Sequence, residues 1–187
     1  MKNPIILASS SPRRQELLKL LTDDFLVVPS TVEEVIDVRL SPIDVATELA
    51  RIKAEDVAQA YSNHIVIGCD TVVIIDNEII GKPKNASHAF DILSKLSNKT
   101  HQVITGCAVV YMNKTHVIYG LAEVTFKPLT SEEINAYILT KEPFGKAGAY
   151  AIQGYAAKFV EHINGDYYSI MGLPVAKLYA YLKEHIQ

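Results

Sequence analysis

The stretch HIVIGCDTVVIIDNEIIGKPK, residues 64–84, decides the fold that the sequence predicts. Two Val/Ile-rich runs flank the dipeptide Asp76-Asn77, so the segment is expected to form a β-hairpin with its turn there. The first run is apolar at nearly every position, which is typical of a buried strand. Asp70 interrupts this run as a lone carboxylate, and a tight GKPK turn follows the second run.

The elements on either side of this hairpin predict the rest of the architecture. Before it, short strands are expected at residues 5–8 and 25–28, and helices start at Ser11-Pro12 and Ser41-Pro42, the second running to about Tyr61. Their apolar stripes are Leu17, Leu18 and Leu21 on the first helix and Val45, Leu49, Ile52 and Val57 on the second. After the hairpin, helices are expected at residues 86–96, 130–140 and 174–185, and strands at 102–112, 116–127 and 158–163.

This order predicts an α/β fold with a mixed, twisted sheet and flanking helices. The two long strands join through Asn113-Lys114, and Thr130-x-x-Glu133 is a capping box at the start of its helix. We expect residues 1–187 to form a single domain. Within it, hairpins become frequent near residue 100, which indicates two small lobes around a central cleft.

The composition excludes several classes of protein. The chain has 187 residues and a net charge of −3, so it lacks the basic field of a non-specific nucleic-acid binder, and any anion site must be local. Cys69 and Cys107 stand alone in apolar runs and are expected to be buried, reduced thiols. The sequence shows no signal peptide and no apolar stretch of membrane-spanning length, so we expect a cytoplasmic protein.

Four segments place chemically capable side chains outside regular elements. SSSPRR, residues 9–14, lies between a strand and a helix N-terminus and suits phosphate oxygens, unless its arginines are simply solvated. Asp70 is expected to be paired, metal-bound or catalytic, or else to bond a neighbouring backbone amide. The GKPK turn and the loop FGKAGAYAIQG, residues 144–154, suit a ligand or a plain solvated surface.

Glu33-Glu34 and Lys53 complete the set of candidate residues, although a solvated pair and a lysine with an exposed ammonium are the simpler alternatives. Together, the segments supply cations from three separate places, an isolated aspartate and a pair of carboxylates. Cations bind phosphates, and carboxylates bind a divalent metal and activate water. The set therefore favours a site for a nucleoside triphosphate with a divalent metal.

Six segments resemble, in their order, those of the Maf family, the septum-formation-associated nucleotide pyrophosphatases: ILASSSPRRQELL, ELARIKAEDVA, IGCDTVV, GKP, KAGAYAIQG and NGDYYSIMGLP. The resemblance spans nearly the whole chain. It implies a Maf/ITPase-like fold and hydrolysis of a nucleoside triphosphate to the monophosphate and pyrophosphate, with Mg²⁺ or Mn²⁺. The SIMGLP segment stands where many relatives have a valine pair before the glycine, which is a packing difference.

The resemblance also implies a role for each candidate residue. The catalytic aspartate corresponds to Asp70, and the metal-side carboxylate corresponds to Glu34, with Glu33 adjacent. The phosphate-facing positions are Ser9, Arg14, Lys53 and Lys82. The positions that set base specificity are Arg13, Thr71 and Gln153.

The three specificity residues can read the edge of uracil or thymine, which has two carbonyl acceptors flanking one N–H donor. Arginine donates to a carbonyl oxygen, glutamine donates and accepts side by side, and threonine does either. Cytosine would leave some of these groups without a partner. We therefore predict that dTTP and UTP are hydrolysed much faster than CTP, ATP and GTP. The alternative for Gln153 is that its side chain only braces the glycine-rich loop.

The main functional hypothesis is a house-cleaning pyrophosphatase for canonical and modified pyrimidine triphosphates, with a link to cell-division arrest. The alternative is a nucleotide-sensing regulator that restrains septum formation through partners without turnover, and such a sensor needs no general base at Asp70. An RNA-binding module is disfavoured by the acidic net charge. The expected partner is the triphosphate substrate, with no nucleic acid and no membrane, and a homodimer is compatible with the chain.

Overall fold

The computed structural model of the protein describes residues 4–35 and 39–185. The chain divides into two compact units that alternate along the sequence. Unit 1 comprises Met1–Thr71, Ile104–Gly120 and Gly172–Gln187, and unit 2 comprises Val72–Val103 and Leu121–Met171. Long strands pass from one unit into the other, because the divisions after residues 71, 103 and 120 fall inside them.

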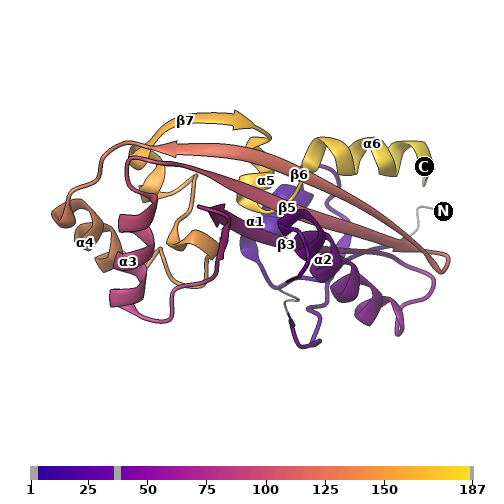
Figure 1. Ribbon diagram of the computed structural model, residues 1–187. Helices are drawn as coiled ribbons and strands as arrows, with labels where there is room; N and C mark the ends of the chain where they lie inside the picture. The colour runs from indigo at the N-terminus through magenta and orange to yellow at the C-terminus, as the bar shows by residue number, and fades with distance from the viewer. Residues whose placement is uncertain (1–3, 36–38, 186–187) are drawn as a thin grey trace. The chain divides into compact units, whose positions relative to one another are not determined.

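In the described part of the chain, seven strands form one mixed sheet (Figure 1), in the order β2-β1-β3-β5-β6-β7 with β4 beside β3. The strands are β1 (Ile5–Leu7), β2 (Phe25–Val27), β3 (Ile65–Ile75), β4 (Glu78–Ile80), β5 (Thr100–Tyr111), β6 (Lys114–Phe126) and β7 (Val160–Gly165). β1 pairs in parallel with β2 and β3, whereas β4 is antiparallel to β3 and β7 is antiparallel to β6. The predicted α/β fold with a mixed sheet and flanking helices is therefore confirmed.

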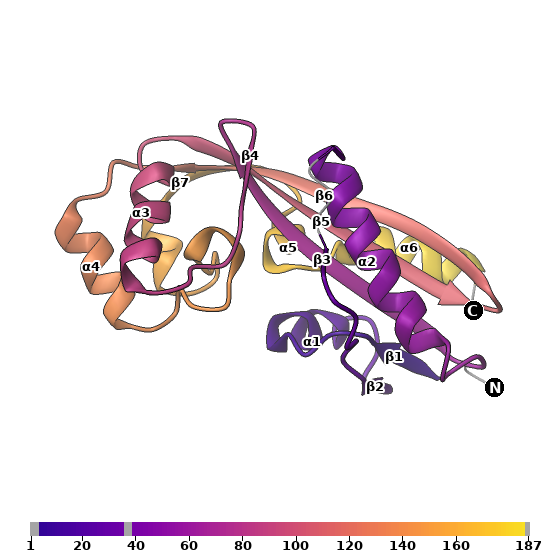
Figure 2. The ribbon, with the colours of Figure 1, turned by 60° about the horizontal axis from the view of Figure 1, so that its bottom comes forward.

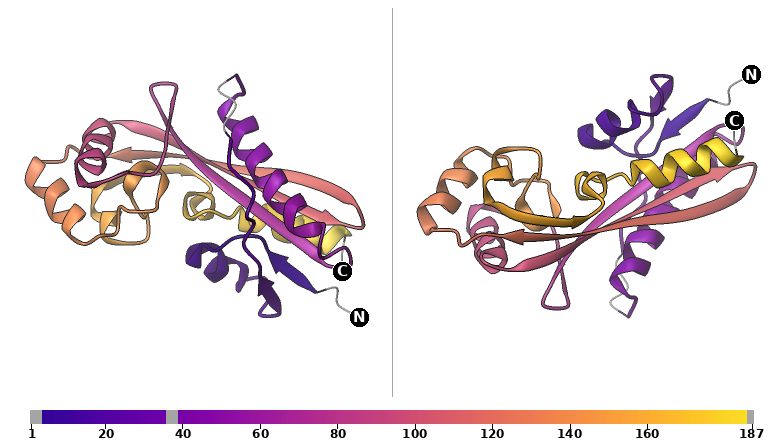
Figure 3. Two further views of the ribbon diagram at one scale, coloured as in Figure 1. Left: turned by 90° about the horizontal axis from the view of Figure 1, so that it is seen from below. Right: turned by 90° about the horizontal axis from the view of Figure 1, so that it is seen from above.

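The helices of unit 1 are α1 (Pro12–Leu18), α2 (Pro42–Ala58) and α6 (Val175–His185). Figure 3 shows α2 in front of the strands from one side and α6 in front from the other, so they cover opposite faces of the unit 1 part of the sheet. Ser41 caps α2 by accepting from the Asp44 N–H, and the Asp44 carboxylate suits the positive end of the helix dipole.

The backbone of α2 lies directly on β3 and β5. Ala46, Ala50 and Ala54 recur every four residues on the buried face of α2. A Cβ atom at Gly68 would lie 2.4 Å from the Ala50 carbonyl oxygen, and one at Gly106 would lie 2.3 Å from that of Ala46. Alanine on the helix and glycine on the strands thus allow an approach that any larger side chain would prevent.

Unit 2 combines several short helices with a cluster of aromatic side chains. Helices α3 (Ala86–Leu96) and α4 (Ser131–Leu139) lie side by side (Figure 1, Figure 2), and the 3-10 helices η1 (Ala147–Ala149) and η2 (Tyr155–Phe159) and the short helix α5 (Tyr167–Met171) follow later in the chain. Thr130 and Glu133 form the predicted capping box of α4. The rings that meet edge to face in this core are those of His101, Phe126, Tyr137, Tyr150 and Phe159.

Some predicted bounds differ from the structure. Met112-Asn113 forms the turn between β5 and β6, not Asn113-Lys114, because Met112 and Asn113 take the positive φ angles, 49° and 60°, that a tight hairpin requires. β7 begins at Val160, not at residue 158, because η2 continues through Phe159. The sequence does not predict α5, whose five residues are too few to show a helical period.

Three details of the unit 1 helices also differ from expectation. Ser11 occupies the cap position of α1, but within the described residues its hydroxyl makes no capping hydrogen bond. Helix α1 ends at Leu18, so Leu21 lies beyond it. On α2, Lys53 is buried beside the expected apolar stripe, whereas Ile52 is only half-buried.

Expectations from the composition are met where the structure tests them. Cys69 and Cys107 are buried free thiols, as predicted. Cys107 donates a hydrogen bond to Cys69, and this bond together with burial raises the pKa of the Cys107 thiol well above its ordinary value. Within the described residues, no helix combines the length and the apolar character needed to cross a membrane.

The buried histidine of unit 2 gives the fold a pH dependence. His101 is 1% exposed, and its Nε2 lies 2.8 Å from the Tyr150 hydroxyl. Burial lowers the pKa of His101 from 6.5 to about 4, so between these values an unfolded chain binds a proton that the folded chain excludes. Excluding this proton costs the folded state nothing above pH 6.5. Below pH 6.5 the folded state loses stability relative to the unfolded chain, and the loss grows as the pH falls toward 4.

We predict that His101→Gln flattens the acid side of the stability profile, since the amide can bond the Tyr150 hydroxyl but does not titrate. Between pH 7 and pH 4, the wild-type free energy of unfolding should fall by about 3 kcal/mol more than that of the variant. Urea denaturation at several pH values measures the difference. His162→Gln, at an exposed position, is the control and should keep the wild-type slope. Equal slopes for wild type and His101→Gln would contradict the prediction.

Candidate functional site

The guanidinium group of Arg14 ties three segments of unit 1 together. Its Nε donates to the Gly172 carbonyl oxygen at 2.9 Å, Nη1 to Ser9 Oγ at 3.1 Å, and Nη2 to Thr71 Oγ1 at 3.1 Å. Ser9 Oγ also accepts from the Ser11 N–H at 3.3 Å. A guanidinium has five N–H donors, so these contacts leave one on each terminal nitrogen for a ligand.

The Thr71 hydroxyl is shared between Arg14 and a second threonine. Thr71 Oγ1 lies 2.7 Å from Thr105 Oγ1, on the neighbouring strand β5. A hydroxyl makes at most one bond as donor and two as acceptor, so these contacts leave Thr71 one further hydrogen bond. Thr105, which is 0% exposed, is not among the site residues that the sequence predicts. The signal that could have identified it is a lone hydroxyl in an apolar run, VITGCAVV.

The Lys53 ammonium lies between two carboxylates of unit 1. Its Nζ is 2.6 Å from Asp70 Oδ1 and 2.9 Å from Glu34 Oε1. Lys53 and Asp70 are each 9% exposed, and charges with so little solvent need a partner of opposite sign. The close approach of α2 to β3 at Gly68 brings the lysine within reach of the aspartate two residues further along the strand. We call Lys53, Asp70 and Glu34 the ion cluster.

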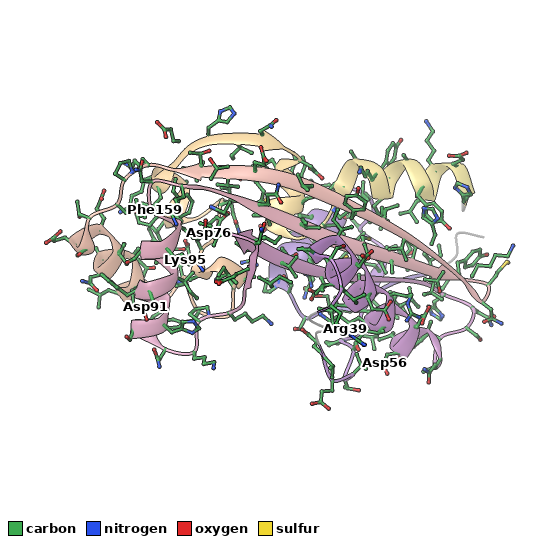
Figure 4. The ribbon with its side chains drawn as sticks, viewed as in Figure 1. Arg39, Asp56, Asp76, Asp91, Lys95 and Phe159 are labelled. Carbon is green, nitrogen blue, oxygen red and sulfur yellow. The ribbon has the colours of Figure 1, made fainter. Side chains whose placement is uncertain are left out.

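The loop that carries Glu34 is anchored to α2. The Ser30 hydroxyl donates to Asp56 Oδ2 at 2.7 Å, and the Thr31 N–H donates to the same oxygen at 3.1 Å. Asp56 lies on α2 (Figure 4), three residues after Lys53, so both project from neighbouring positions of one helix. Asp56 is not among the predicted site residues, because a carboxylate on a helix is most often solvated.

The ion cluster suits a divalent cation that arrives with a phosphate. Within residues 4–35 and 39–185, no group of three or more His, Cys, Asp or Glu side chains is arranged to hold a metal ion. Mg²⁺ is commonly bound by one or two carboxylates together with substrate phosphates and water, and does not require an all-protein cage. Glu34 and Asp70 supply two such hard oxygen ligands, which lie close together because both contact the Lys53 ammonium. The residues present therefore fit the expected metal.

Unit 2 holds the predicted residues Lys82 and Gln153, both exposed. Lys82 follows Gly81, whose carbonyl oxygen accepts from the Gly148 N–H at 3.3 Å. Gly148 has a φ of 70° and lies against Val73, and only glycine tolerates this combination without strain. The GKP turn and the glycine-rich segment that leads to Gln153 are therefore joined by their backbones.

The structure groups the predicted site residues by unit. Unit 1 holds the ion cluster and the set around Arg14, and the two meet on β3, where Asp70 and Thr71 are consecutive. Arg13 is half-buried on α1, next to Arg14. In unit 2, Lys146 of the glycine-rich loop donates to the Glu142 carbonyl oxygen at 2.6 Å, so this lysine braces its own loop.

Comparison with known proteins identifies relatives along nearly the whole chain. The family model for Maf-like protein matches residues 4–185. A dTTP/UTP pyrophosphatase from Bacillus cereus (strain AH187) is 51% identical over 180 residues, which cover 96% of this chain and 94% of that protein. Another from Bacillus cytotoxicus is 53% identical over 179 residues, with the same coverage of both.

A solved structure shares the fold. The Staphylococcus aureus Ham1 protein superimposes with a TM-score of 0.56 over 97% of this chain and 98% of that one. The sequence identity is only 16%, so the likeness concerns the fold alone.

We predict that Gly68→Ala destabilises the protein by more than about 2 kcal/mol, because the new methyl group would overlap the backbone of α2. Its Cβ would meet the Ala50 carbonyl oxygen at 2.4 Å and the Ala54 nitrogen at 2.6 Å. Gly81→Ala is the control, since a Cβ there meets no described atom within 4 Å, and it should stay within about 0.5 kcal/mol of wild type. Denaturant unfolding measures both, and similar values would show that α2 does not rest on β3.

Proposed function

Because the chain belongs to the Maf-like protein family, we propose that it is a nucleotide pyrophosphatase that hydrolyses dTTP and UTP to the monophosphate and pyrophosphate. The observation that carries this proposal is the ion cluster, in which the buried Lys53 ammonium holds two carboxylates. The chain that carries this cluster is about half identical to proteins named dTTP/UTP pyrophosphatases. Cations and carboxylates are the groups that phosphoanhydride hydrolysis requires.

Asp70 is the proposed general base. In this role the Asp70 carboxylate accepts a proton from the attacking water as the α–β phosphoanhydride bond breaks. Such a base must be held in place, and the 2.6 Å contact with Lys53 orients it. Lys53 also places positive charge where the phosphate charge develops. A divalent metal, Mg²⁺ or Mn²⁺, would be held by Glu34 and Asp70 together with the phosphates, and when bound it supplies further neutralisation of phosphate charge.

The remaining phosphate contacts come from Ser9, Arg14 and Lys82 in this proposal. Arg14 is already oriented by its bonds to Ser9, Thr71 and Gly172, so its two remaining N–H groups are fixed in direction before a nucleotide binds. The two arginines at the start of α1 oppose the helix dipole, and a bound polyanion offsets that cost. Lys82 is exposed, so its ammonium group is open to a soluble triphosphate.

Base selection is assigned to Arg13, Thr71 and Gln153. Thr71 keeps one hydrogen-bonding position beyond its contacts with Arg14 and Thr105, which suits a single bond to a base edge. Gln153 is exposed on its loop and offers an adjacent donor and acceptor. We assign no further protein partner to the reaction, and we propose that both units act as one Maf-like nucleotide pyrophosphatase domain in the cytoplasm.

A panel of dTTP, UTP, CTP, ATP and GTP tests the function directly. We expect pyrophosphate release from dTTP and UTP well above the other three, because only the uracil and thymine edges satisfy all three specificity residues. Each reaction is followed with a pyrophosphate-coupled assay in Mg²⁺, in Mn²⁺ and after exhaustive chelation, which should abolish turnover. A purine-first profile would overturn the base assignment, and binding without turnover would favour the nucleotide-sensing alternative.

We predict that Asp70→Asn lowers kcat for dTTP by about 10²–10⁴-fold while the nucleotide still binds, because an amide cannot take the proton. Turnover is measured by pyrophosphate release and binding by isothermal titration calorimetry. The matched control is Asp76→Asn, in the β3–β4 turn, which replaces a carboxylate that pairs with Lys99. Near-normal turnover by Asp70→Asn would show that this carboxylate is structural.

A further inference from the structure

Glu142, in the loop after α4, holds the backbone on the far side of Gln153. Its Oε2 accepts from the Tyr155 N–H at 3.2 Å, and its Oε1 accepts from the Ala156 N–H at 3.4 Å. Both amides belong to the start of η2, which begins two residues after the predicted specificity residue Gln153. The half-buried carboxylate thus satisfies N–H groups that begin a helical turn.

Tyr137 extends this contact to the near side of the same segment. Its hydroxyl donates to Glu142 Oε1 at 2.8 Å and accepts from the Ala151 N–H at 3.2 Å. Tyr137 is 1% exposed and its ring packs edge to face on Phe159, with 5.3 Å between centroids, so the hydroxyl has a fixed position. Residues 151–156 are therefore bound at both ends by one pair of side chains, with Gln153 between the ends.

Gly154 shows how closely the carboxylate approaches the segment. A Cβ atom built at Gly154 would lie 2.1 Å from Glu142 Oε2. Glycine at this position, directly after Gln153, leaves the space that the carboxylate occupies. The Gly154 N–H in turn donates to the Ala151 carbonyl oxygen at 3.0 Å, which closes a tight turn around Gln153.

We propose that Glu142, acting through Tyr137 and the backbone of residues 151–156, is a positioning residue for base selection. This inference rests on the proposed function, in which Gln153 reads the base. The Gln153 side chain is exposed, so the packing of a core does not fix it, and its direction depends on how its backbone is held. A base-reading amide discriminates only when its donor and acceptor are presented in a defined orientation.

A carboxylate is the group this position requires. It accepts bonds on both oxygens, and the three donors that face Glu142 are one hydroxyl and two backbone N–H groups. In Glu142→Gln, one oxygen becomes an NH₂ group that faces at least one of these backbone donors and repels it. The variant keeps the size of the side chain, so it removes the hold on the segment without opening a cavity.

The test is a double-mutant cycle that compares wild type, Glu142→Gln, Gln153→Ala and the double variant. The quantity measured is the ratio of kcat/KM for UTP to that for CTP. We expect Glu142→Gln to lower this ratio about tenfold or more, the size of one lost charge-assisted hydrogen bond. In the Gln153→Ala background the same change should have no further effect on the ratio, because the group that Glu142 positions is absent.

Two further variants keep the result interpretable. Tyr137→Phe removes the hydroxyl that joins Ala151 to Glu142 but retains the buried ring, and it should lower the ratio in the same direction. Glu132→Gln changes an exposed carboxylate on α4 and should leave the ratio within about twofold of wild type. If Glu142→Gln does not fold, the same cycle is run with Tyr137→Phe.

The outcomes separate this inference from the proposed function. Equal losses for UTP and CTP, or an effect of Glu142→Gln that persists without Gln153, would show a merely structural role and overturn the inference. Wild-type protein that releases no pyrophosphate from any triphosphate would contradict the proposed function instead. In that case the ratio of dissociation constants for UTP and CTP, measured in Mg²⁺, replaces the kinetic ratio, and equal changes in both constants overturn the inference.

Discussion

The contact between the backbone of α2 and the strands β3 and β5 is the constraint on which the unit 1 site depends. Gly68 and Gly106 leave no side chain between helix and sheet, and alanines on the facing turns of α2 allow the approach. At this separation a lysine on the helix reaches an aspartate on the strand at 2.6 Å. A wider spacing would leave the two charges buried and unpaired, which is costly.

The ion cluster and the Arg14 contacts have the same physical character. In each, a cation is fixed by more than one protein group: Lys53 by two carboxylates, and Arg14 by two hydroxyls and a carbonyl oxygen. Groups that are held in place before a ligand binds lose little conformational entropy when it arrives. Their electrostatic field also needs no reorientation during a reaction. The two sets adjoin on β3, so one strand carries both the proposed base and a residue proposed to read the substrate.

Unit 2 presents its residues by a different means. Lys82 and Gln153 are exposed, and the loops that carry them are held by hydrogen bonds to their backbones. The bond from Gly148 to Gly81 joins the two loops, and the Glu142–Tyr137 pair holds the segment around Gln153. Glycines at positions 148 and 154 allow these approaches, one because of its positive φ and one because a carboxylate occupies the space of a side chain.

The sequence by itself determined the order of the strands and of the longer helices, and the types of residue at the candidate site. Asp76-Asn77, Ser41-Pro42 and the Thr130–Glu133 capping box are local signals, because a turn or a helix start depends on neighbouring residues alone. Asp70 stood out for the same reason, as a charge in an apolar run. The pairing of that charge with Lys53 and the bond from Thr71 to Thr105 join residues 17 and 34 positions apart. Only the tertiary structure decided these contacts, because they depend on how closely a helix and two strands approach, and no local pattern encodes that distance.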